Sequence, residues 1–343
     1  MIWLAGIRRI GKTSLCRSLS NTTYFDCELP RTRRRLEDPE QFLEDNRNKR
    51  IVLDEIHRLS NPSELLKIAA DYYPDIKIIA TGSSTLGASA KFKDTLAGRK
   101  ETIWLTPILL EELEAFSSKS LRHRLLHGGF PGFFLSDRIA EKEFQDWMDS
   151  FWAKDLQELF RIERRSSFLK FTELLFAQSG SLFDATKFSK LCEISRVAVT
   201  SYLSILEATF IVHILKPYSK HKPTEIISRP KIYAMDTGFV CYYKGWDQIH
   251  DQEKGYLWEH IVLNQIQTHL EIRNMQYWRN KQGKEIDLVL ASKKGEVHAV
   301  ECKWKAAQFE TDNVRSFRNL HPRGRNFVVA TDITEPFKKK MHG

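Results

Sequence analysis

The chain has 343 residues, of which 42% are hydrophobic and 28% are charged, a balance that is typical of folded globular proteins and excludes a disordered chain. A protein of this length needs more than one hydrophobic core, so we expect two or three domains. Lysine and arginine outnumber the acidic residues by 53 to 44, and the formal net charge of +9 favours an anionic partner such as nucleic acid.

The cysteines and the hydrophobic segments indicate where the protein resides. The five cysteines are odd in number and lack paired metal-ligand spacing, which argues against a disulfide framework and a zinc site. No apolar run reaches the roughly 20 residues that cross a bilayer. Met1 to Ile10 lack the pattern of a secretory signal. We therefore expect a cytoplasmic protein that does not associate with a membrane.

The first third of the chain alternates short apolar segments with helical or polar stretches. The apolar segments are rich in β-branched and aromatic residues, as the strands of a parallel α/β sheet are. Strands are predicted at residues 2–5, 23–26, 50–54, 76–81 and 101–105. We expect a parallel α/β sheet in a first domain of residues 1–108.

A phosphate-binding motif follows the first predicted strand. Gly6, Gly11, Lys12 and Thr13 match the pattern GxxxxGK[ST] without departure, and a helical pattern continues from Ser14. The glycines let backbone N–H groups surround phosphates, the lysine places a positive charge on the β and γ oxygens, and the threonine hydroxyl ligates Mg²⁺ at a helix N-terminus. The motif predicts binding of a nucleoside triphosphate, with ATP and Mg²⁺ as the expected cofactors.

The predicted strand at 50–54 leads into two acidic residues. Asp54 and Glu55 follow the apolar run from Ile51 to Leu53, and acids at the carboxyl end of a strand point toward the ligand of an α/β sheet. We expect Asp54 to hold Mg²⁺, and Glu55 to orient and deprotonate the attacking water. Acids also begin many helices, an alternative that the intact phosphate-binding motif disfavours.

Polar and basic residues beyond the acidic strand complete the expected nucleotide site. Thr81, Ser83 and Ser84 are expected at the same edge of the sheet, and one of their hydroxyls could hold the attacking water or sense the γ-phosphate; helix capping by Ser83 or Ser84 is the alternative. Arg99 could stabilise the transferred phosphoryl group, in cis or across a subunit interface, and a surface arginine is the alternative. The residues expected at the nucleotide are Gly6, Ile7, Arg8, Arg9, Ile10, Gly11, Lys12, Thr13, Ser14, Asp54 and Ser83.

The middle of the chain is predicted to be helical and then to form a winged helix. Apolar residues three and four apart indicate a helical lid or linker over 109–182, interrupted by a glycine- and proline-rich loop at 128–134. Residues 183–236 contain two predicted helices joined by a tight turn, then strand-like segments at 210–218 and 231–234. Helix, turn, helix and hairpin is the pattern of a winged-helix domain.

The winged-helix pattern makes DNA a candidate partner. In a DNA-reading winged helix the second helix enters the major groove, and a basic wing contacts phosphates. A domain spacer with a solvated basic loop is the alternative. The candidate contact residues are Ser195, Arg196, Thr200 and Ser201 on the second helix, and Lys216, Lys220, His221, Lys222 and Arg229 in and around the hairpin.

A separate α/β unit is expected over residues 250–343, in the order helix, three strands, helix, strand. Its elements are predicted at 256–270, 276–279, 285–291, 297–304, 310–320 and 326–330.

Charged residues gather on one face of this predicted sheet. Asp287 lies in one strand, and Glu301 and Lys303 are two residues apart in the next, so both point to one face. The two acids could bind Mg²⁺, with Glu259 on the preceding helix completing the metal shell, while Lys303 activates water or stabilises the phosphorane. The spacing resembles the D…ExK signature of restriction-endonuclease-like nucleases. A degenerate nucleic-acid-binding domain and a purely structural domain are the alternatives.

Taken together, the motifs resemble those of the prokaryotic AAA-related P-loop ATPases that carry a C-terminal restriction-endonuclease-like domain. The matching segments, in the family's order, are GIRRIGKTS, IVLDEIH, IIATGSS, LAGR, TPILLEEL, GGFP, EIDLVL and VECKWK. By resemblance, Lys12 and Thr13 are the phosphate-loop residues, and Asp54 and Glu55 are the residues of the acidic strand. Ser83 is the polar sensor, and Arg99 is the LAGR arginine. The implied fold is a P-loop sheet, a helical and winged-helix middle region, and a restriction-endonuclease-like α/β domain.

One departure from that family concerns the start of the chain. Members usually have a few dozen residues ahead of the phosphate-binding loop that help to cover the nucleotide base, whereas five residues precede Gly6 here. We therefore expect nucleotide binding to persist and turnover to be the property that needs testing.

Two functional hypotheses follow. The first is an ATP-hydrolysing enzyme that couples its nucleotide state to DNA binding and to metal-dependent cleavage by the terminal domain. The second is a non-catalytic signalling or regulatory ATPase switch, whose terminal domain is a degenerate nuclease that binds a partner or nucleic acid. A homo-oligomer is expected if Arg99 acts in trans.

Overall fold

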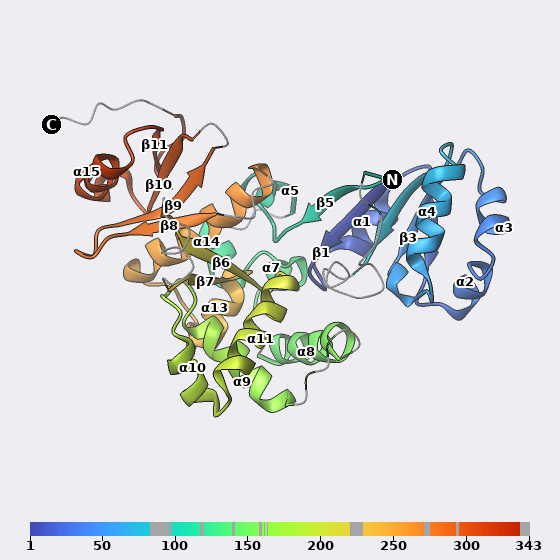
Figure 1. The fold of residues 1–343 in the computed structure, drawn as a ribbon, viewed down its shortest axis with the longest axis horizontal. Coiled ribbons are helices and arrows are strands. Elements are labelled where there is room, and N and C mark those ends of the chain that lie inside the picture. Colours follow the sequence, from blue (N-terminus) through green and yellow to red (C-terminus); the bar gives the residue numbers. More distant parts are fainter. Residues whose placement is uncertain are drawn as a thin grey trace.

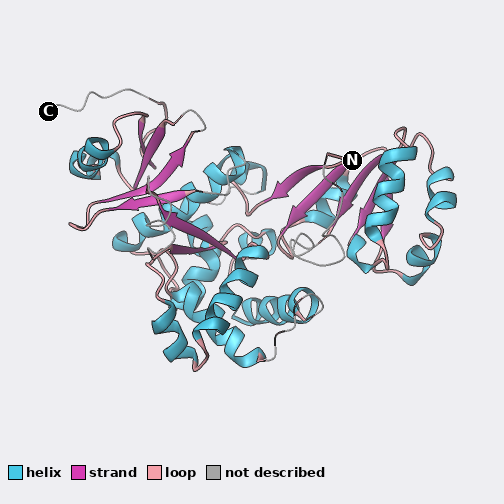
Figure 2. Cartoon of the chain, viewed as in Figure 1, coloured by secondary structure: helices cyan, strands magenta, loops and turns pink. Residues whose placement is uncertain are grey.

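The chain folds around two β-sheets that are joined by a helical region (Figure 1). The computed structural model describes residues 1–82, 96, 98–116, 120–138, 141–157, 160, 162, 164–219, 229–270, 275–292 and 295–336. Figure 2 shows the two sheets at separate places in the molecule, with many of the helices gathered near the second sheet. The sequence-predicted residues Ser83, Ser84, Lys220, His221 and Lys222 lie outside the described residues.

The N-terminal sheet is parallel and has the strand order β2-β3-β4-β1-β5. Its strands are β1 (Ile2–Gly6), β2 (Thr23–Asp26), β3 (Arg50–Asp54), β4 (Lys77–Thr81) and β5 (Glu101–Leu105), which confirms the five predicted strands. Parallel strands are buried on both faces, and Ile51, Val52 and Leu53 have no exposed surface. Because β4 lies between β1 and β3, the carboxyl ends of these three strands meet at one edge of the sheet.

Short helices accompany this sheet. They are α1 (Lys12–Ser18), α2 (Pro30–Arg35), α3 (Pro39–Glu44), η1 (Ile56–Arg58) and α4 (Pro62–Tyr72). Proline begins α2, α3 and α4, where its missing N–H is not needed, and Asp38 caps α3 by accepting the backbone N–H of Gln41. The apolar side chains of these helices form one core with the sheet, which includes Phe25, Phe42 and Leu66.

The middle region is helical, as predicted. Its elements are η4 (Leu110–Glu112), α5 (Leu113–Phe116), α6 (Leu121–His127), α7 (Pro131–Leu135), α8 (Glu141–Phe151), η5 (Trp152–Leu156), α9 (Arg165–Ala177), α10 (Ala185–Cys192), α11 (Arg196–Ala208) and α13 (Thr237–Lys244). The loop predicted at 128–134 is wrong in its second half, because Pro131 fits the first turn of a helix and begins α7. Within the described ranges, no helix is both long and apolar enough to cross a membrane.

Two glycines between α6 and α7 let the chain pass against a buried ion pair. Arg124 Nη1 and Asp236 Oδ2 lie 3.3 Å apart, and the side chains are 2% and 0% exposed. A Cβ on Gly128 would lie 1.8 Å from an Asp236 carboxylate oxygen. A Cβ on Gly129 would lie 2.4 Å from Arg124 Nη2, and the Gly129 N–H donates to Asp236 at 2.7 Å. The absence of side chains at the two glycines thus lets the end of α6 pack closely against the start of α13.

The C-terminal sheet is mixed and has the strand order β11-β10-β9-β8-β6-β7. Its strands are β6 (Val212–Pro217), β7 (Lys231–Ala234), β8 (Gln276–Arg279), β9 (Glu285–Ala291), β10 (Val297–Lys303) and β11 (Asn326–Ala330). The helices α14 (Asp251–Leu270) and α15 (Thr311–Leu320) pack against it, and η6 (Ala306–Gln308) follows β10. The predicted element order of this part is confirmed.

The hairpin of the predicted winged helix belongs to this same sheet. Helices α10 and α11 and strands β6 and β7 follow one another as predicted, and the two strands pair in antiparallel fashion. Strand β6 also pairs in parallel with β8, with Lys216 opposite Gln276. The domain boundary expected after residue 236 is therefore crossed by strand pairing. Strand β8 pairs with the edge of β6 that would stay unpaired in an independent winged-helix hairpin.

Candidate functional site

The phosphate-binding loop runs from the end of β1 to the start of α1. Gly6 ends β1, and a Cβ here would lie 2.8 Å from the carbonyl oxygen of Leu105 and 3.0 Å from Ile10 Cγ2. Gly11 has a φ of 105°, in the left-handed region that favours glycine, and directly precedes α1. Arg9 is also left-handed, with a φ of 62°, and is exposed. The two glycines let the loop close tightly, which is the shape that a phosphate cradle needs.

Lys12 is held inside this loop. It is 6% exposed, and its Nζ donates to the carbonyl oxygens of Gly6 at 2.8 Å and Ile7 at 3.0 Å. Burial lowers the pKa of Lys12, while the charges of Glu55 and Asp155 act to raise it. The ammonium group therefore sits on hydrogen-bond acceptors that phosphate oxygens can replace.

Three hydroxyl groups surround the Asp54 carboxylate at the carboxyl edge of the sheet. Thr13 Oγ1 donates to Oδ2 at 2.8 Å, and the hydroxyls of Tyr24 and Thr81 also donate to this carboxylate. The Thr13 hydroxyl and the 2% exposed Asp54 are hard oxygen donors, so the pair fits Mg²⁺. Sequence reasoning missed Tyr24, which the parallel register of β2 and β3 places opposite Val52.

Glu55 follows β3 in a left-handed conformation with a φ of 53°. Its backbone N–H donates to Thr81 Oγ1 at 3.1 Å, and its Oε2 lies 3.1 Å from His57 Nδ1. Burial acts to raise the pKa of Glu55, but His57 and Lys12 outweigh burial and lower the pKa to about 2. The carboxylate is therefore ionised at neutral pH. An ionised carboxylate can accept a hydrogen bond from water and orient it, but it cannot act as a proton donor.

Arg8 connects the loop to the helical region. Its Nε donates to Asp155, a 2% exposed residue of η5, and its backbone oxygen accepts from Trp147 Nε1 of α8 at 3.2 Å. Ile7 and Ile10 of the loop pack into the same core as α8 and η5. Sequence reasoning missed Asp155 and Trp147, because a contact between residues so far apart in the chain leaves no local pattern.

The C-terminal sheet brings three charged side chains together, as predicted. Asp287 lies on β9, and Glu301 and Lys303 lie on the adjacent β10. Lys303 Nζ donates to Glu301 Oε2 at 2.6 Å and to Asp287 Oδ2 at 3.3 Å. Burial and the charge of Asp287 raise the pKa of Glu301 to about 7. Among the residues that the structure describes, its buried Oε1 has no hydrogen-bond partner.

Glu259 of α14 lies near this cluster but has a different partner. Its carboxylate accepts from the Tyr233 hydroxyl at 2.9 Å, and burial together with the charge of Asp287 raises the pKa of Glu259 to about 7. In the part of the chain that the structure describes, no three His, Cys, Asp or Glu side chains are arranged to hold a metal ion. Tyr233 donates to the carboxylate of Glu259, and Lys303 donates to those of Asp287 and Glu301; a metal shell formed by these three acids stays a prediction.

Comparisons with known proteins agree with the geometry of the N-terminal site. Residues 1–114 match the family model of an AAA domain. The match covers the parallel sheet and the phosphate-binding loop, and residues 1–114 are called the AAA domain below. Behind the AAA domain, residues 118–250 match a domain of unknown function, DUF8612, and residues 254–342 match another, DUF4143.

Individual proteins are similar to the chain at low identity. Two uncharacterized proteins, from Mycobacterium bovis and Mycobacterium tuberculosis, are each 26% identical over 300 residues, which cover 84% of this chain and 67% of the relative. The Holliday junction branch migration motor RuvB of Thermotoga maritima is 16% identical, with a TM-score of 0.29 over 62% of this chain and 80% of RuvB. A signal transduction ATPase with a tetratricopeptide repeat sensor from Pyrococcus horikoshii is 13% identical, with a TM-score of 0.26 over 76% of this chain and 42% of that chain.

Arg99 of the AAA domain lies away from the nucleotide site. It precedes β5 at the amino-terminal edge of the sheet, whereas Asp54 lies at the carboxyl edge. Its guanidinium donates to the Asp71 carboxylate at 2.7 Å and 3.1 Å, and both side chains are exposed. A role of Arg99 within its own subunit therefore does not fit, and a role across a subunit interface stays a prediction. Ser14, also predicted at the nucleotide, is exposed in the first turn of α1.

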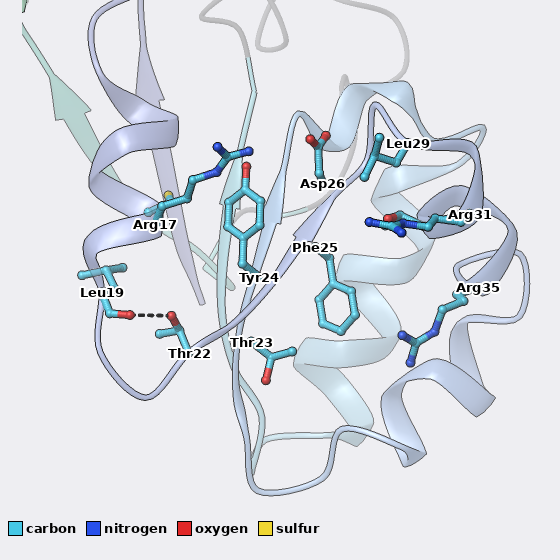
Figure 3. Close-up of a pocket in the computed structure, with 12 residues that line it drawn as sticks. Arg17, Leu19, Thr22, Thr23, Tyr24, Phe25, Asp26, Leu29, Arg31 and Arg35 are labelled. Atoms are coloured by element: carbon cyan, nitrogen blue, oxygen red, sulfur yellow. Dashed lines mark hydrogen bonds between the residues drawn. The ribbon is translucent and has the colours of Figure 1, made fainter.

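A basic hollow of about 770 Å³ opens on the β2 side of the AAA domain (Figure 3). Arg17 of α1 lies on one side, with its guanidinium carbon 5.0 Å from the centroid of the Tyr24 ring. Arg31 and Arg35 of α2 lie on the other side. The hollow adjoins the nucleotide site, because the hydroxyl of Tyr24 donates to Asp54.

The predicted DNA-contacting residues of the second helix lie on or beside α11. Ser195 caps this helix by accepting a backbone N–H at 3.1 Å, and the Thr200 hydroxyl donates to the backbone oxygen of Arg196 at 3.1 Å. Both hydroxyls are thus engaged within the helix itself. Other exposed candidates include Arg196, Ser201, Lys216 and Arg229.

Proposed function

We propose that the chain is a Mg²⁺-dependent ATPase whose AAA domain binds and hydrolyses ATP. The observation that carries the proposal is the convergence of Lys12, Thr13, Asp54 and Glu55 at the carboxyl edge of one parallel sheet. Thr13 Oγ1 and Asp54 Oδ2 are only 2.8 Å apart, and hydroxyl and carboxylate oxygens are the donors that Mg²⁺ prefers.

Each residue has a distinct physical task in this proposal. Lys12 exchanges its two backbone acceptors for phosphate oxygens and neutralises their charge. Thr13 and Asp54 hold Mg²⁺, which neutralises charge on the β and γ phosphates when it is bound. Glu55 accepts a hydrogen bond from water and orients that water toward the γ-phosphate. Because its pKa is held at about 2, Glu55 keeps its charge throughout the physiological range.

Matched variants test the ATPase proposal through ATP binding and turnover. We expect Lys12→Ala to lose both, and Glu55→Gln to keep binding while its turnover falls by at least about 100-fold. Lys77→Ala is the control, because this lysine is exposed at the amino-terminal end of β4, and it should hydrolyse ATP like the wild type. Equal rates of ATP turnover by Lys12→Ala and the wild type would contradict the proposal.

We further propose that the ATPase couples its nucleotide state to DNA. Two features of charge support this partner, namely the net charge of +9 and the arginines of the basic hollow. The contact between Tyr24 and Asp54 gives the coupling a route, because it joins the hollow to the proposed magnesium ligand. The dependence of DNA affinity on salt, compared between the wild type and variants of the hollow, tests this partner.

A second candidate function, metal-dependent DNA cleavage, is favoured by the Glu301 carboxylate. Its buried Oε1 has no hydrogen-bond partner in the described part of the chain, and a buried oxygen without a partner calls for an ion or an ordered water. Asp287 supplies a second carboxylate, and Lys303 lies against both. We expect the wild type to cut DNA with Mg²⁺ or Mn²⁺, and Asp287→Ala and Lys303→Ala not to cut. No cutting, or equal cutting by all three, rejects the nuclease and leaves the regulatory switch with a degenerate terminal domain.

A further inference from the structure

Asp155 belongs to the helical region, and its buried carboxylate contacts the phosphate-binding loop. It accepts from Arg8 Nε, and the side chains of Arg8 and Asp155 are 14% and 3% exposed. Trp147 Nε1 donates to the backbone oxygen of the same arginine at 3.2 Å. Both the backbone and the side chain of Arg8 are therefore held by α8 and η5.

The local helix geometry explains how a carboxylate reaches this place. Element η5 is a π-helix, in which the Gln157 N–H donates to the Trp152 oxygen at 2.9 Å. Trp152, Asp155 and Leu156 are all buried, so the wide turn packs two apolar side chains and still directs one carboxylate to Arg8. Single π-helical turns are rare and are frequent at functional sites.

The charge of Asp155 also acts on the rest of the nucleotide site. Asp155 and Glu55 both act to raise the pKa of Lys12, against the effect of burial. Glu55 acts on Arg8 in the same direction. The two cations and two carboxylates thus form one electrostatic group, although Asp155 belongs to no phosphate-binding motif.

We propose that Asp155 is a positioning residue that competes with the phosphates of bound nucleotide for Arg8. Without nucleotide, the buried carboxylate needs its arginine partner. A triphosphate brings more negative charge and several strong acceptors to the loop, so Arg8 exchanges Asp155 for phosphate oxygens. The carboxylate that is left without a partner must regain water, which moves η5 relative to the loop. The inference rests on the proposed binding of ATP, and it adds the route by which nucleotide reaches the helical region.

Calorimetric titration with ATP and with ADP, both in Mg²⁺, tests the competition. We expect Asp155→Asn to bind ATP at least about fivefold more tightly than the wild type, with a smaller gain for ADP, because the competing charge is gone. Asp155→Glu keeps the charge and should restore the wild-type affinity. Asp149→Asn is the matched control on α8, because Asp149 is 63% exposed and pairs with Arg165, and it should leave the affinity unchanged.

A second variant keeps the inference testable if Asp155→Asn does not fold. We expect the wild type to prefer ATP over ADP, because the additional phosphate offers further acceptors to Arg8. Arg8→Gln should lose this preference, and with it the ATP-dependent change in tryptophan emission that we expect from Trp147 and Trp152. Unchanged or weaker ATP binding by Asp155→Asn, or a wild-type preference in Arg8→Gln, would overturn the inference while ATP binding itself stands. A wild type that binds no ATP overturns the proposed function, and the inference with it.

Discussion

His260 is a buried histidine of α14 that the fold holds in its neutral form. Its Nε2 lies 2.7 Å from Ser179 Oγ, and its Nδ1 lies 3.0 Å from the backbone oxygen of Tyr256. One ring nitrogen therefore donates to a carbonyl, and the other accepts from a hydroxyl. Burial lowers the pKa of His260 from its ordinary value of 6.5 to about 4, and the positive charges of Lys231 and Lys244 act in the same direction.

This histidine predicts a loss of stability in mild acid. Since its folded-state pKa of about 4 lies below the unfolded value of 6.5, the unfolded chain takes up the proton first as the pH falls. The stabilisation is full above pH 6.5 and is lost as the pH falls to about 4. We expect His260 to contribute on the order of 3 kcal/mol to the decrease in the free energy of unfolding.

Urea unfolding of the wild type and of His260→Gln, at about pH 7.5 and about pH 4.5, measures this contribution. The variant keeps hydrogen-bonding groups but has no proton to take up, so its stability should fall less in acid. An identical decrease in the two proteins would show that His260 does not carry the effect.

Local pattern decides which residues of the nucleotide site the sequence can predict. Lys12 and Thr13 follow from the spacing of the glycine-rich motif, and Asp54 follows from the end of an apolar strand. Tyr24 and Asp155 are not predictable in this way. The first depends on the order of strands in the sheet, and the second depends on the packing of a helix from another part of the chain.

At the scale of elements, the junction between α6 and α7 gives a steric test. An alanine Cβ at Gly128 would lie 1.8 Å from Asp236 Oδ1, at a φ of 82° that favours glycine. We expect Gly128→Ala to lower the free energy of unfolding by more than about 3 kcal/mol, or to prevent folding. Gly132→Ala in α7 is the control, because an added Cβ there meets no atom of the described residues within 4 Å. Its effect should stay within about 1 kcal/mol.

Thermal unfolding followed by circular dichroism compares these two glycine variants. A melting temperature that is similar for Gly128→Ala and Gly132→Ala would contradict the steric account of the junction.

Elements defined by nearby residues are predictable, and pairing between distant elements is not. The strands at 23–26, 50–54 and 101–105 have the predicted bounds, because short apolar segments lie between polar turns. Helix α7 is not predicted because its proline and the preceding glycines are typical of a loop. In the structure the proline begins the helix, and the glycines allow a close contact with the buried ion pair. The pairing of β6 with β8 escapes prediction because it joins strands from two parts of the sequence.

Across the whole molecule, the AAA domain contacts both of the other parts. Ile7 and Ile10 of the phosphate-binding loop belong to the core of the helical region. Thr268 of α14 donates to Thr106, which follows β5, at 3.2 Å. The phosphate-binding loop is therefore a structural junction as well as a candidate nucleotide site.

The arginines of the basic hollow provide a test of the proposed DNA partner. Each arginine that neutralises a phosphate releases bound counterions, so its removal flattens the dependence of affinity on salt. We expect the double variant Arg31→Ala, Arg35→Ala to bind duplex DNA more weakly, with a slope of log affinity against log salt that is smaller by about 2. Fluorescence anisotropy with labelled DNA at several salt concentrations measures both quantities.

A charge-matched double variant separates the hollow from the general charge of the domain. Arg47→Ala, Arg50→Ala removes two exposed arginines of the same domain, one of which pairs with Asp75 at 2.8 Å, and it should change the slope little. An equal decrease of the salt slope in both double variants would attribute the effect to net charge and reject the hollow as the binding surface.

Because Tyr24 joins the hollow to Asp54, we also expect ATP with Mg²⁺ to alter DNA affinity in the wild type, and this response to be lost in Tyr24→Phe.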